Sequence, residues 1–283
     1  MADSKLTVRL PRPADQVRPL DKAAFLENRR TRLEAAAEAA RFKKETTCYT
    51  CYWIKENCRC PLIKPFATET RFVILMHSKE AKKEKLGTGR ICKATLIDSR
   101  IIVGIDFTHD PEVNALLADP GNHCMVMYPG RHSLNISKDD VGPLLEPRKH
   151  GRKLVVFLVD GTWQCAKKMM RLSLNIRSLP RVSFTAHHES IFFIKEQPAA
   201  YCLSTLESIH FFLCEADRRG VESLPGRPQD NLIVVFKSMI DFMVRCALDP
   251  KRKSYRGSPT GYSARETRKK RKPSSQRSIV LPD

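Results

Sequence analysis

Four short apolar runs constrain the fold of this chain more than any other feature. They are bounded by turn-forming residues and read RFVILMH (71–77), SRIIVGI (99–105), HCMVMYPG (123–130) and LVVFLVDG (154–161). A strand with one solvated face alternates apolar and polar residues, whereas continuous hydrophobicity is typical of strands covered on both faces. A sheet buried in this way needs helices above and below it.

Helix-like segments lie between and after these runs. They are HSKEAKKEKLG (77–87), DPEVNALLADPG (110–121), CAKKMMRLSLNIRSLP (165–180), STLESIHFFLCEADRRG (204–220) and DNLIVVFKSMIDFMVRCALD (230–249). The β-branched start of the last segment leaves a strand open there. The alternation predicts an α/β fold, a mostly parallel sheet with helices on both faces.

The flanking regions differ in composition from this core. Three prolines and no periodicity predict a disordered leader over 1–20, and an Ala-, Glu- and Arg-rich stretch predicts a helix over 21–45. A cysteine-rich knuckle is expected over 46–65 and the α/β domain over 66–250. Eleven basic residues against one acid in 251–277 predict a disordered basic tail over 251–283.

The net charge of +19 favours a polyanionic partner, because each phosphate neutralised by Lys or Arg releases a condensed counterion. Nucleic acid is the leading partner class, and an anionic membrane surface is the alternative. No apolar run approaches the roughly 20 residues that span a bilayer, and the first residues lack the apolar core of a secretory signal. The chain is therefore expected to be intracellular, in the nucleus or the cytoplasm, and not inserted in a membrane.

Four of the ten cysteines are clustered in CYTCYWIKENCRC. They form a CxxC pair, a six-residue gap and a CxC pair: Cys48, Cys51, Cys58 and Cys60. Four thiolates within so short a stretch can surround one tetrahedral Zn²⁺ as a closed structural site. The alternative is a loop of free thiols.

Candidate site residues follow the apolar runs, because ligands of open α/β sheets bind beyond the carboxyl ends of the strands. The candidates are His77, then Tyr128, Pro129 and Gly130, then Asp160, Gly161, Thr162 and Trp163, with a loop that supplies Gly87, Thr88, Gly89 and Arg90. Each has a structural alternative. His77 can be a hydrogen-bonded core histidine, the GTGR stretch a turn, Asp160 or Thr162 a helix N-cap, and Trp163 a core filler.

A further candidate is the sequence Ser204-Thr205-Leu206-Glu207, which precedes an apolar helix. Ser-x-x-Glu at this point predicts a capping box, in which the two side chains satisfy each other's backbone donors. A helix N-terminus also attracts carboxylates and phosphates, so a capping role and a ligand-binding role can coexist.

Four motifs follow one another along the chain: the cysteine knuckle, the YPG segment, the DGTW turn followed by QCAKKM, and the STLES segment. In these motifs and their order the chain resembles the eukaryotic DTW-domain tRNA-uridine aminocarboxypropyltransferases. The similarity spans about residues 45 to 247. It implies a fold akin to the knotted SPOUT methyltransferases, with 66–250 as the catalytic domain. It also implies transfer of the 3-amino-3-carboxypropyl group of S-adenosylmethionine to N3 of a tRNA uridine, with release of methylthioadenosine.

The resemblance also assigns residues. The implied cofactor-binding residues are Tyr128, Pro129, Thr162, Trp163, Ser204, Thr205 and Glu207. Asp160 is the candidate base for N3, since burial at a strand end raises the basicity of a carboxylate. The GTGR loop has Gly87 where the family pattern leads us to expect an asparagine nearby, which leaves direct contacts by Thr88 and Arg90 open.

N3 lies on the Watson–Crick edge, so the target uridine must be unpaired or flipped out. Arg90, Arg131 and the basic tail are candidate phosphate contacts. Two other functions stay open: a SPOUT-like methyltransferase that uses the same cofactor, and a noncatalytic adaptor that binds zinc and RNA. The oligomeric state and the tRNA position are not specified by the sequence.

Overall fold

The computed structural model describes residues 21–83, 87–130, 132–186, 189–194 and 202–249, and the chain divides into two compact units, 1–47 and 48–283. The predicted leader, the predicted tail and Arg131 lie outside the described residues. Within these described ranges no helix is both long enough and apolar enough to cross a membrane.

The described part of the first unit is dominated by helix α1 (Lys22–Thr46). Its N-terminus is capped by Asp21, whose carboxylate accepts a 2.9 Å hydrogen bond from the backbone N–H of Ala24. Ion pairs one turn apart follow along the helix, among them Arg41 with Glu45 at 2.9 Å. Strong helix formers and local charge pairs therefore account for this element.

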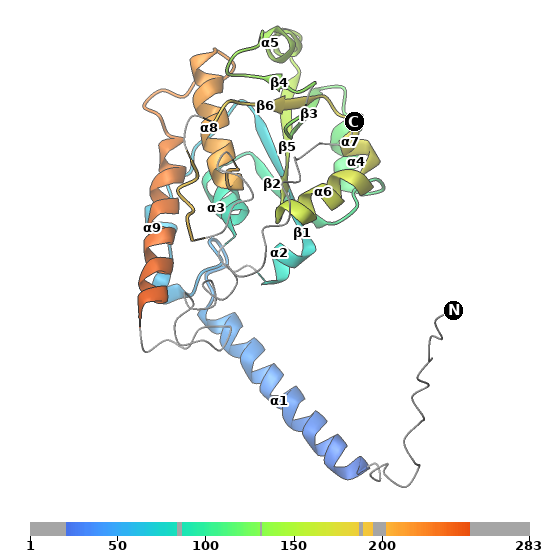
Figure 1. Cartoon of the computed structure of the whole chain (residues 1–283), viewed down its shortest axis with the longest axis vertical. Coiled ribbons are helices and arrows are strands. Elements are labelled where there is room, and N and C mark those ends of the chain that lie inside the picture. Colours follow the sequence, from blue (N-terminus) through green and yellow to red (C-terminus); the bar gives the residue numbers. More distant parts are fainter. Residues whose placement is uncertain (1–20, 84–86, 131, 187–188, 195–201, 250–283) are drawn as a thin grey trace, which may run out of the picture. The chain divides into compact units, whose positions relative to one another are not determined.

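The second unit is built on a six-stranded sheet in the order β2-β1-β5-β3-β6-β4, in which every neighbouring pair is parallel (Figure 1). The strands are β1 (Arg71–His77), β2 (Ser99–Gly104), β3 (Asn122–Met127), β4 (Leu134–Asn135), β5 (Lys153–Asp160) and β6 (Arg181–Ser183). The four apolar runs are β1, β2, β3 and β5, so the predicted parallel α/β sheet is confirmed. The knot implied by the family resemblance stays a prediction.

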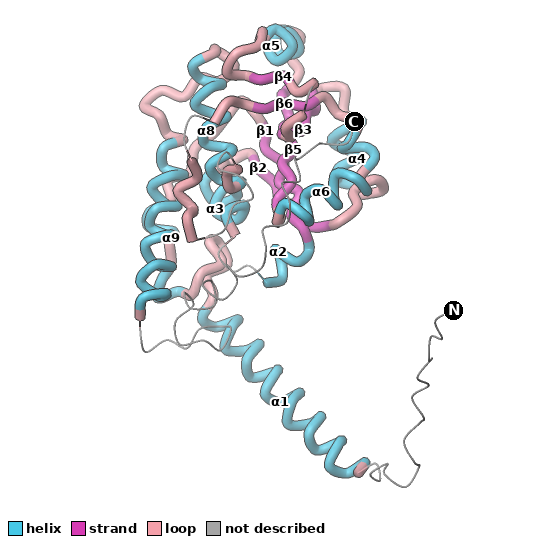
Figure 2. Tube along the Cα trace, in the orientation of Figure 1, coloured by secondary structure: helices cyan, strands magenta, loops and turns pink. Residues whose placement is uncertain are grey.

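Helices cover both faces of the sheet, as the continuous hydrophobicity predicted (Figure 2). Leu154, Val156 and Leu158 of β5 pack in one core cluster with α3 (Thr88–Thr95), α8 (Thr205–Arg218) and α9 (Asp230–Leu248). Val155 and Phe157 face the other cluster, with α4 (Pro111–Ala118), α6 (Trp163–Leu172) and α7 (Leu174–Arg177). Because side chains alternate along a strand, Asp160 continues the face covered by α3 and α8.

Two further α-helices lie in the described part of this unit, α2 (Ser78–Lys83) and α5 (Gly142–Lys149). The segment 230–248 is helical throughout, which resolves its ambiguous start. Its buried residues recur at the helical spacing: Leu232, Val235, Phe236, Met239 and Ile240.

One local expectation was wrong. The GTGR stretch is not a loop, because Thr88, Gly89 and Arg90 form the first turn of α3 with Gly87 as its N-cap. Two glycines hid the helix start, since glycine is unfavourable in helix interiors and common in turns.

Candidate functional site

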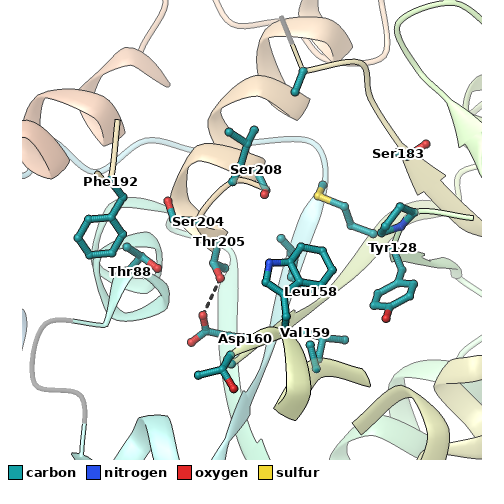
Figure 3. A pocket seen from close by; sticks show the side chains of 18 of the residues that line it. Thr88, Tyr128, Leu158, Val159, Asp160, Ser183, Phe192, Ser204, Thr205 and Ser208 are labelled. Carbon is teal, nitrogen blue, oxygen red and sulfur yellow. Dashed lines mark hydrogen bonds between the residues drawn. The ribbon is translucent and has the colours of Figure 1, made fainter. Parts of the chain in front are cut away.

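A cavity of about 1020 Å³ opens at the carboxyl ends of β5, β3 and β6 (Figure 3). Seven of the eight candidate catalytic and cofactor-binding residues line it: Tyr128, Pro129, Asp160, Thr162, Trp163, Ser204 and Thr205. They come from three separate stretches of sequence that the parallel sheet brings to one edge. The cavity lies where a ligand site is expected in an open α/β sheet.

Three helices begin at this cavity. Thr88 opens α3, Trp163 opens α6 and Thr205 opens α8, and all three residues line the cavity. A helix N-terminus carries partial positive charge and unpaired N–H groups. The cavity is therefore suited to a ligand that carries a carboxylate or another anionic group.

Asp160 lies among these helix ends. Its side chain is buried, and its Oδ1 accepts a 2.6 Å hydrogen bond from the hydroxyl of Thr205, drawn as a dashed line in Figure 3. The bond ties the end of β5 to the start of α8. The carboxyl group of Asp160 is thus held in a fixed position in the cavity wall.

Gly89 explains how α3 approaches this carboxylate so closely. A Cβ atom built on Gly89 would lie 2.8 Å from Asp160 Oδ2 and 3.2 Å from Ile74 Cγ2. Any side chain here would push Asp160 or the helix away. Close packing against Asp160 therefore requires a glycine at position 89, the residue that obscured the helix start in the sequence.

Thr162 and Ser204 each cap a helix and line the cavity, whereas their binding of a ligand stays a prediction. Thr162 caps α6, where its hydroxyl accepts a bond of 3.4 Å from the N–H of Cys165, and it also lines the cavity. Ser204 caps α8 in the predicted capping box and lines the cavity as well.

Glu207 does not line the cavity but organises its wall. Its buried carboxylate accepts hydrogen bonds from the N–H of Ser204 at 2.8 Å, the hydroxyl of Ser204 at 2.7 Å and the N–H of Ile191 at 2.8 Å. The hydroxyl of Ser190 donates a fourth, at 2.8 Å. Glu207 therefore joins the loop around 190 to the start of α8 and acts on the cavity through Ser204.

Tyr128 and Pro129 form the wall contributed by the end of β3. Tyr128 is buried, and the guanidinium of Arg181 lies 5.7 Å from its ring centre. Burial raises the pKa of the Tyr128 phenol, and Arg181 opposes this shift. Tyr128 is a neutral aromatic wall at physiological pH.

Several cavity residues had no signal in the sequence. They include Glu80 from α2, Ser183 at the end of β6, Phe184 to Ala186 after it, and Phe192 and Leu203 before α8. Strand β6 has only three residues, too few for a recognisable apolar run. Because β6 is so short, its contribution to the cavity was not predicted from the sequence.

Two candidates take structural roles instead. His77 is buried at the end of β1, and its Nδ1 accepts a 3.0 Å bond from the N–H of Lys79. Burial, together with Lys79 and Lys168, lowers the pKa of His77, so the ring is neutral. It is the hydrogen-bonded core histidine weighed as the alternative.

Arg90 is engaged within the protein. Its guanidinium lies 4.2 Å from the ring centre of Tyr52 and donates a 2.6 Å bond to the carbonyl of Ala81. Tyr52 has a φ of 62°, a left-handed conformation that is strained for a bulky residue. The contact between Arg90 and the Tyr52 ring joins the cysteine knuckle to the first turn of α3.

The four clustered cysteines converge on one point. Cys48 and Cys60 have their sulfurs 3.6 Å apart, as do Cys51 and Cys58, and all four sulfurs lie within 4.8 Å of one another. Ligands about 2.3 Å from a tetrahedral zinc would lie roughly 3.8 Å apart. The donor set thus fits one Zn²⁺, and short helices η2 (Lys55–Asn57) and η3 (Cys60–Leu62) shape the knuckle.

The thiols of the cluster differ in their electrostatics, since burial raises the pKa of the Cys58 and Cys60 thiols. A hydrogen bond from the backbone N–H of Cys51 lowers the pKa of the Cys48 thiol to about 6, against an opposing effect of burial. The guanidinium of Arg59 lies 4.6 Å from the Trp53 ring centre and 5.3 Å from that of Phe242 in α9. This cation, next to Cys58 and Cys60 in the chain, balances part of the thiolate charge.

We expect Cys51→Ser to lower zinc content and thermal stability together, because a serine hydroxyl is a poor ligand and Cys51 is buried in the core. Elemental analysis of the purified protein and a thermal melt measure the two effects. Cys124→Ser, at a partly buried cysteine outside the cluster, is the control. Full zinc content in Cys51→Ser would contradict the assignment.

Comparison with known proteins gives one family match: the model of the DTW domain family matches residues 45–244. Among curated proteins, the tRNA-uridine aminocarboxypropyltransferase 2 of Macaca fascicularis is 26% identical over 209 residues, which cover 72% of this chain and 65% of that protein. The protein of the same name from Drosophila melanogaster is 30% identical over 158 residues, which cover 53% of this chain and 59% of that protein.

The similar protein from Mus musculus is 25% identical over 169 residues, 58% of this chain and 54% of its own length. This chain therefore spans less than two thirds of the length of each of these relatives. No solved structure matches the chain significantly.

Proposed function

Since the chain belongs to the DTW domain family, we propose that it is a tRNA-uridine aminocarboxypropyltransferase. It would transfer the 3-amino-3-carboxypropyl group of S-adenosylmethionine to N3 of a tRNA uridine. The observation that carries the proposal is the cavity in which Asp160 and three helix N-termini meet.

The residues present fit S-adenosylmethionine as a cosubstrate. Its amino acid end carries a carboxylate, which suits the N-termini of α3 and α8, and an ammonium group, which suits the acid Glu80. Aromatic side chains in the lining offer surfaces for the adenine: Tyr128, Trp163, Phe184 and Phe192.

In the proposed reaction, N3 of uridine loses its proton and forms a bond to the terminal methylene carbon of the aminocarboxypropyl group. The bond between that carbon and sulfur breaks, and the sulfur keeps the electron pair, which leaves methylthioadenosine. Asp160 accepts or orients the N3 proton from the end of β5, and Thr205 holds the carboxylate in place. Glu207 keeps Ser204 and the start of α8 fixed.

The partner in this proposal is tRNA. The names of the relatives support it, and the net charge of +19 is suited to a polyanion. The target uridine must be unpaired for N3 to be reached. Structural Zn²⁺ in the cysteine cluster would stabilise the knuckle.

The deciding experiment incubates the purified protein with tRNA and S-adenosylmethionine and identifies both products by mass spectrometry. We expect methylthioadenosine and a uridine that carries the aminocarboxypropyl group. S-Adenosylhomocysteine with a methylated nucleoside would instead indicate a methyltransferase. tRNA binding without cofactor turnover would indicate a noncatalytic adaptor.

Deletion of the residues from Lys251 onward should weaken tRNA binding and flatten its dependence on salt concentration, because their positive charges contact phosphates and not bases. Binding is measured over a series of salt concentrations. We expect modification to stay at the same nucleotide. A shift to a different uridine would mean that the tail contributes to site selection.

A further inference from the structure

A second group of metal-binding side chains lies where α8 meets the start of α9. His210 and Cys214 are one turn apart on α8, and Asp230 is the first residue of α9. His210 Nε2 lies 2.9 Å from Asp230 Oδ1 and 3.7 Å from Cys214 Sγ, and the three donor atoms all lie within 4.8 Å of one another. None of the three lines the cavity described above.

The geometry of the cluster does not match a proton relay. In a Cys-His-Asp relay the thiol and the acid occupy opposite nitrogens of the imidazole. Here both approach the same atom, His210 Nε2, whereas Nδ1 is buried and has no hydrogen-bond partner among the described residues. A nitrogen, a sulfur and an oxygen that converge on one point are arranged as ligands of a shared ion.

The polar network around the cluster is incomplete. Gln229 is fully buried and its Nε2 lies 3.8 Å from Cys214 Sγ, yet its Oε1 has no hydrogen-bond partner within the described ranges. Two buried polar atoms of this group, Gln229 Oε1 and His210 Nδ1, therefore have no hydrogen-bond partner among the described residues. Buried polar groups are normally paired, so the oxygen of Gln229, whose amide nitrogen lies next to Cys214, indicates a missing ligand or ordered solvent.

A cation already occupies the outer side of the cluster. The Arg227 guanidinium contacts Asp230 at 2.8 Å and 3.1 Å, and its Nη2 lies 3.7 Å from Cys214 Sγ. Its side chain is 60% exposed, so it can leave without opening the core. Asp230 and Cys214 thus face a cation that can be displaced.

We propose that His210, Cys214 and Asp230 form a second metal site, distinct from the four-cysteine cluster, that binds a divalent transition-metal ion of borderline softness such as Zn²⁺. Mixed nitrogen, sulfur and oxygen donors suit this class of ion, and three protein ligands leave a fourth position for water. Arg227 supplies the positive charge when no metal is bound and swings outward when the ion enters. The ion would fasten α8 to the start of α9.

The test uses the full-length protein, with Zn²⁺ titrated by calorimetry after dialysis has removed weakly held metal. We expect one reversibly bound Zn²⁺ per chain in addition to the ion retained by the four cysteines. Cys214→Ser should weaken the reversible site by at least about tenfold. Arg227→Gln should bind equally well or more tightly, because it removes the competing cation and keeps all three ligands. Cys124→Ser should match the wild type.

Two results would overturn the proposal. One is a wild-type protein that takes up no Zn²⁺ beyond the ion of the cysteine cluster. The other is a Cys214→Ser protein that binds the second ion as tightly as the wild type does. Should Cys214→Ser fail to fold in a thermal melt, Arg227→Gln decides, since it alters an exposed side chain. Weaker zinc binding by Arg227→Gln would be a third contrary result, because removal of a competing cation cannot weaken binding at this site.

Discussion

Asp160→Asn should fold and still bind S-adenosylmethionine and tRNA within about tenfold, yet transfer at least about a hundredfold more slowly, the usual scale for loss of a general base. The amide keeps an oxygen to accept the hydrogen bond from Thr205, so the junction between β5 and α8 is preserved. It cannot accept a proton from N3. Single-turnover formation of methylthioadenosine, with cofactor affinity measured separately, gives both quantities.

Thr205→Val is the matched variant, because it removes the hydroxyl that holds Asp160 and leaves the carboxylate intact. We expect it to lose less activity than Asp160→Asn. Near-normal transfer by a folded Asp160→Asn protein would leave Asp160 with a structural role only. If activity falls because S-adenosylmethionine no longer binds, Asp160 anchors the cosubstrate and another group must handle the proton.

Glu207→Ala should lower the free energy of unfolding by about 3 kcal/mol, since it breaks the capping box and leaves buried donors unpaired. The donors include the N–H groups of Ser204 and Ile191. Chemical denaturation monitored by circular dichroism measures the change. We also expect weaker S-adenosylmethionine binding, because Ser204 and Thr205 in the cavity wall lose their support.

Glu146→Gln provides the control, since that carboxylate is exposed and its ion-pair partners among the described residues, Lys149 and His150, lie within one turn of it. Its effect should stay within about 0.5 kcal/mol. A loss below about 1 kcal/mol for Glu207→Ala would show that water or a neighbouring group replaces the carboxylate.

The long apolar elements of this fold were predictable from the sequence. Runs such as LVVFLVDG became buried parallel strands, because only helices on both faces can cover side chains that are apolar at every position. The first turn of α3 was not predicted. Gly89 in that turn packs against a residue 71 positions away, Asp160, and no local pattern contains that contact.

The candidate site was predictable to a similar degree. Tyr128, Asp160 and Thr205 were identified because motifs mark the ends of long elements, and all three line the cavity. Glu207 was identified too, but as a cofactor contact, whereas its hydrogen bonds support the wall. The contribution of β6 was not foreseen, since three residues carry too little periodicity to indicate a strand. The roles of these residues in catalysis stay predictions.

The cysteine knuckle shares a hydrophobic core with the helices that begin at the cavity. Cys51 and Trp53 belong to the same buried cluster as Ile91 of α3 and Leu206 of α8. The ring centres of Trp53 and Phe242 of α9 lie 5.2 Å apart. A module that could be cut away or exchanged between proteins would keep its own separate core. The knuckle is therefore an inseparable part of the fold: a shortened chain that begins after Cys60 would expose the α3, α8 and α9 layer to water, and a knuckle grafted onto another protein would lack its supporting surface.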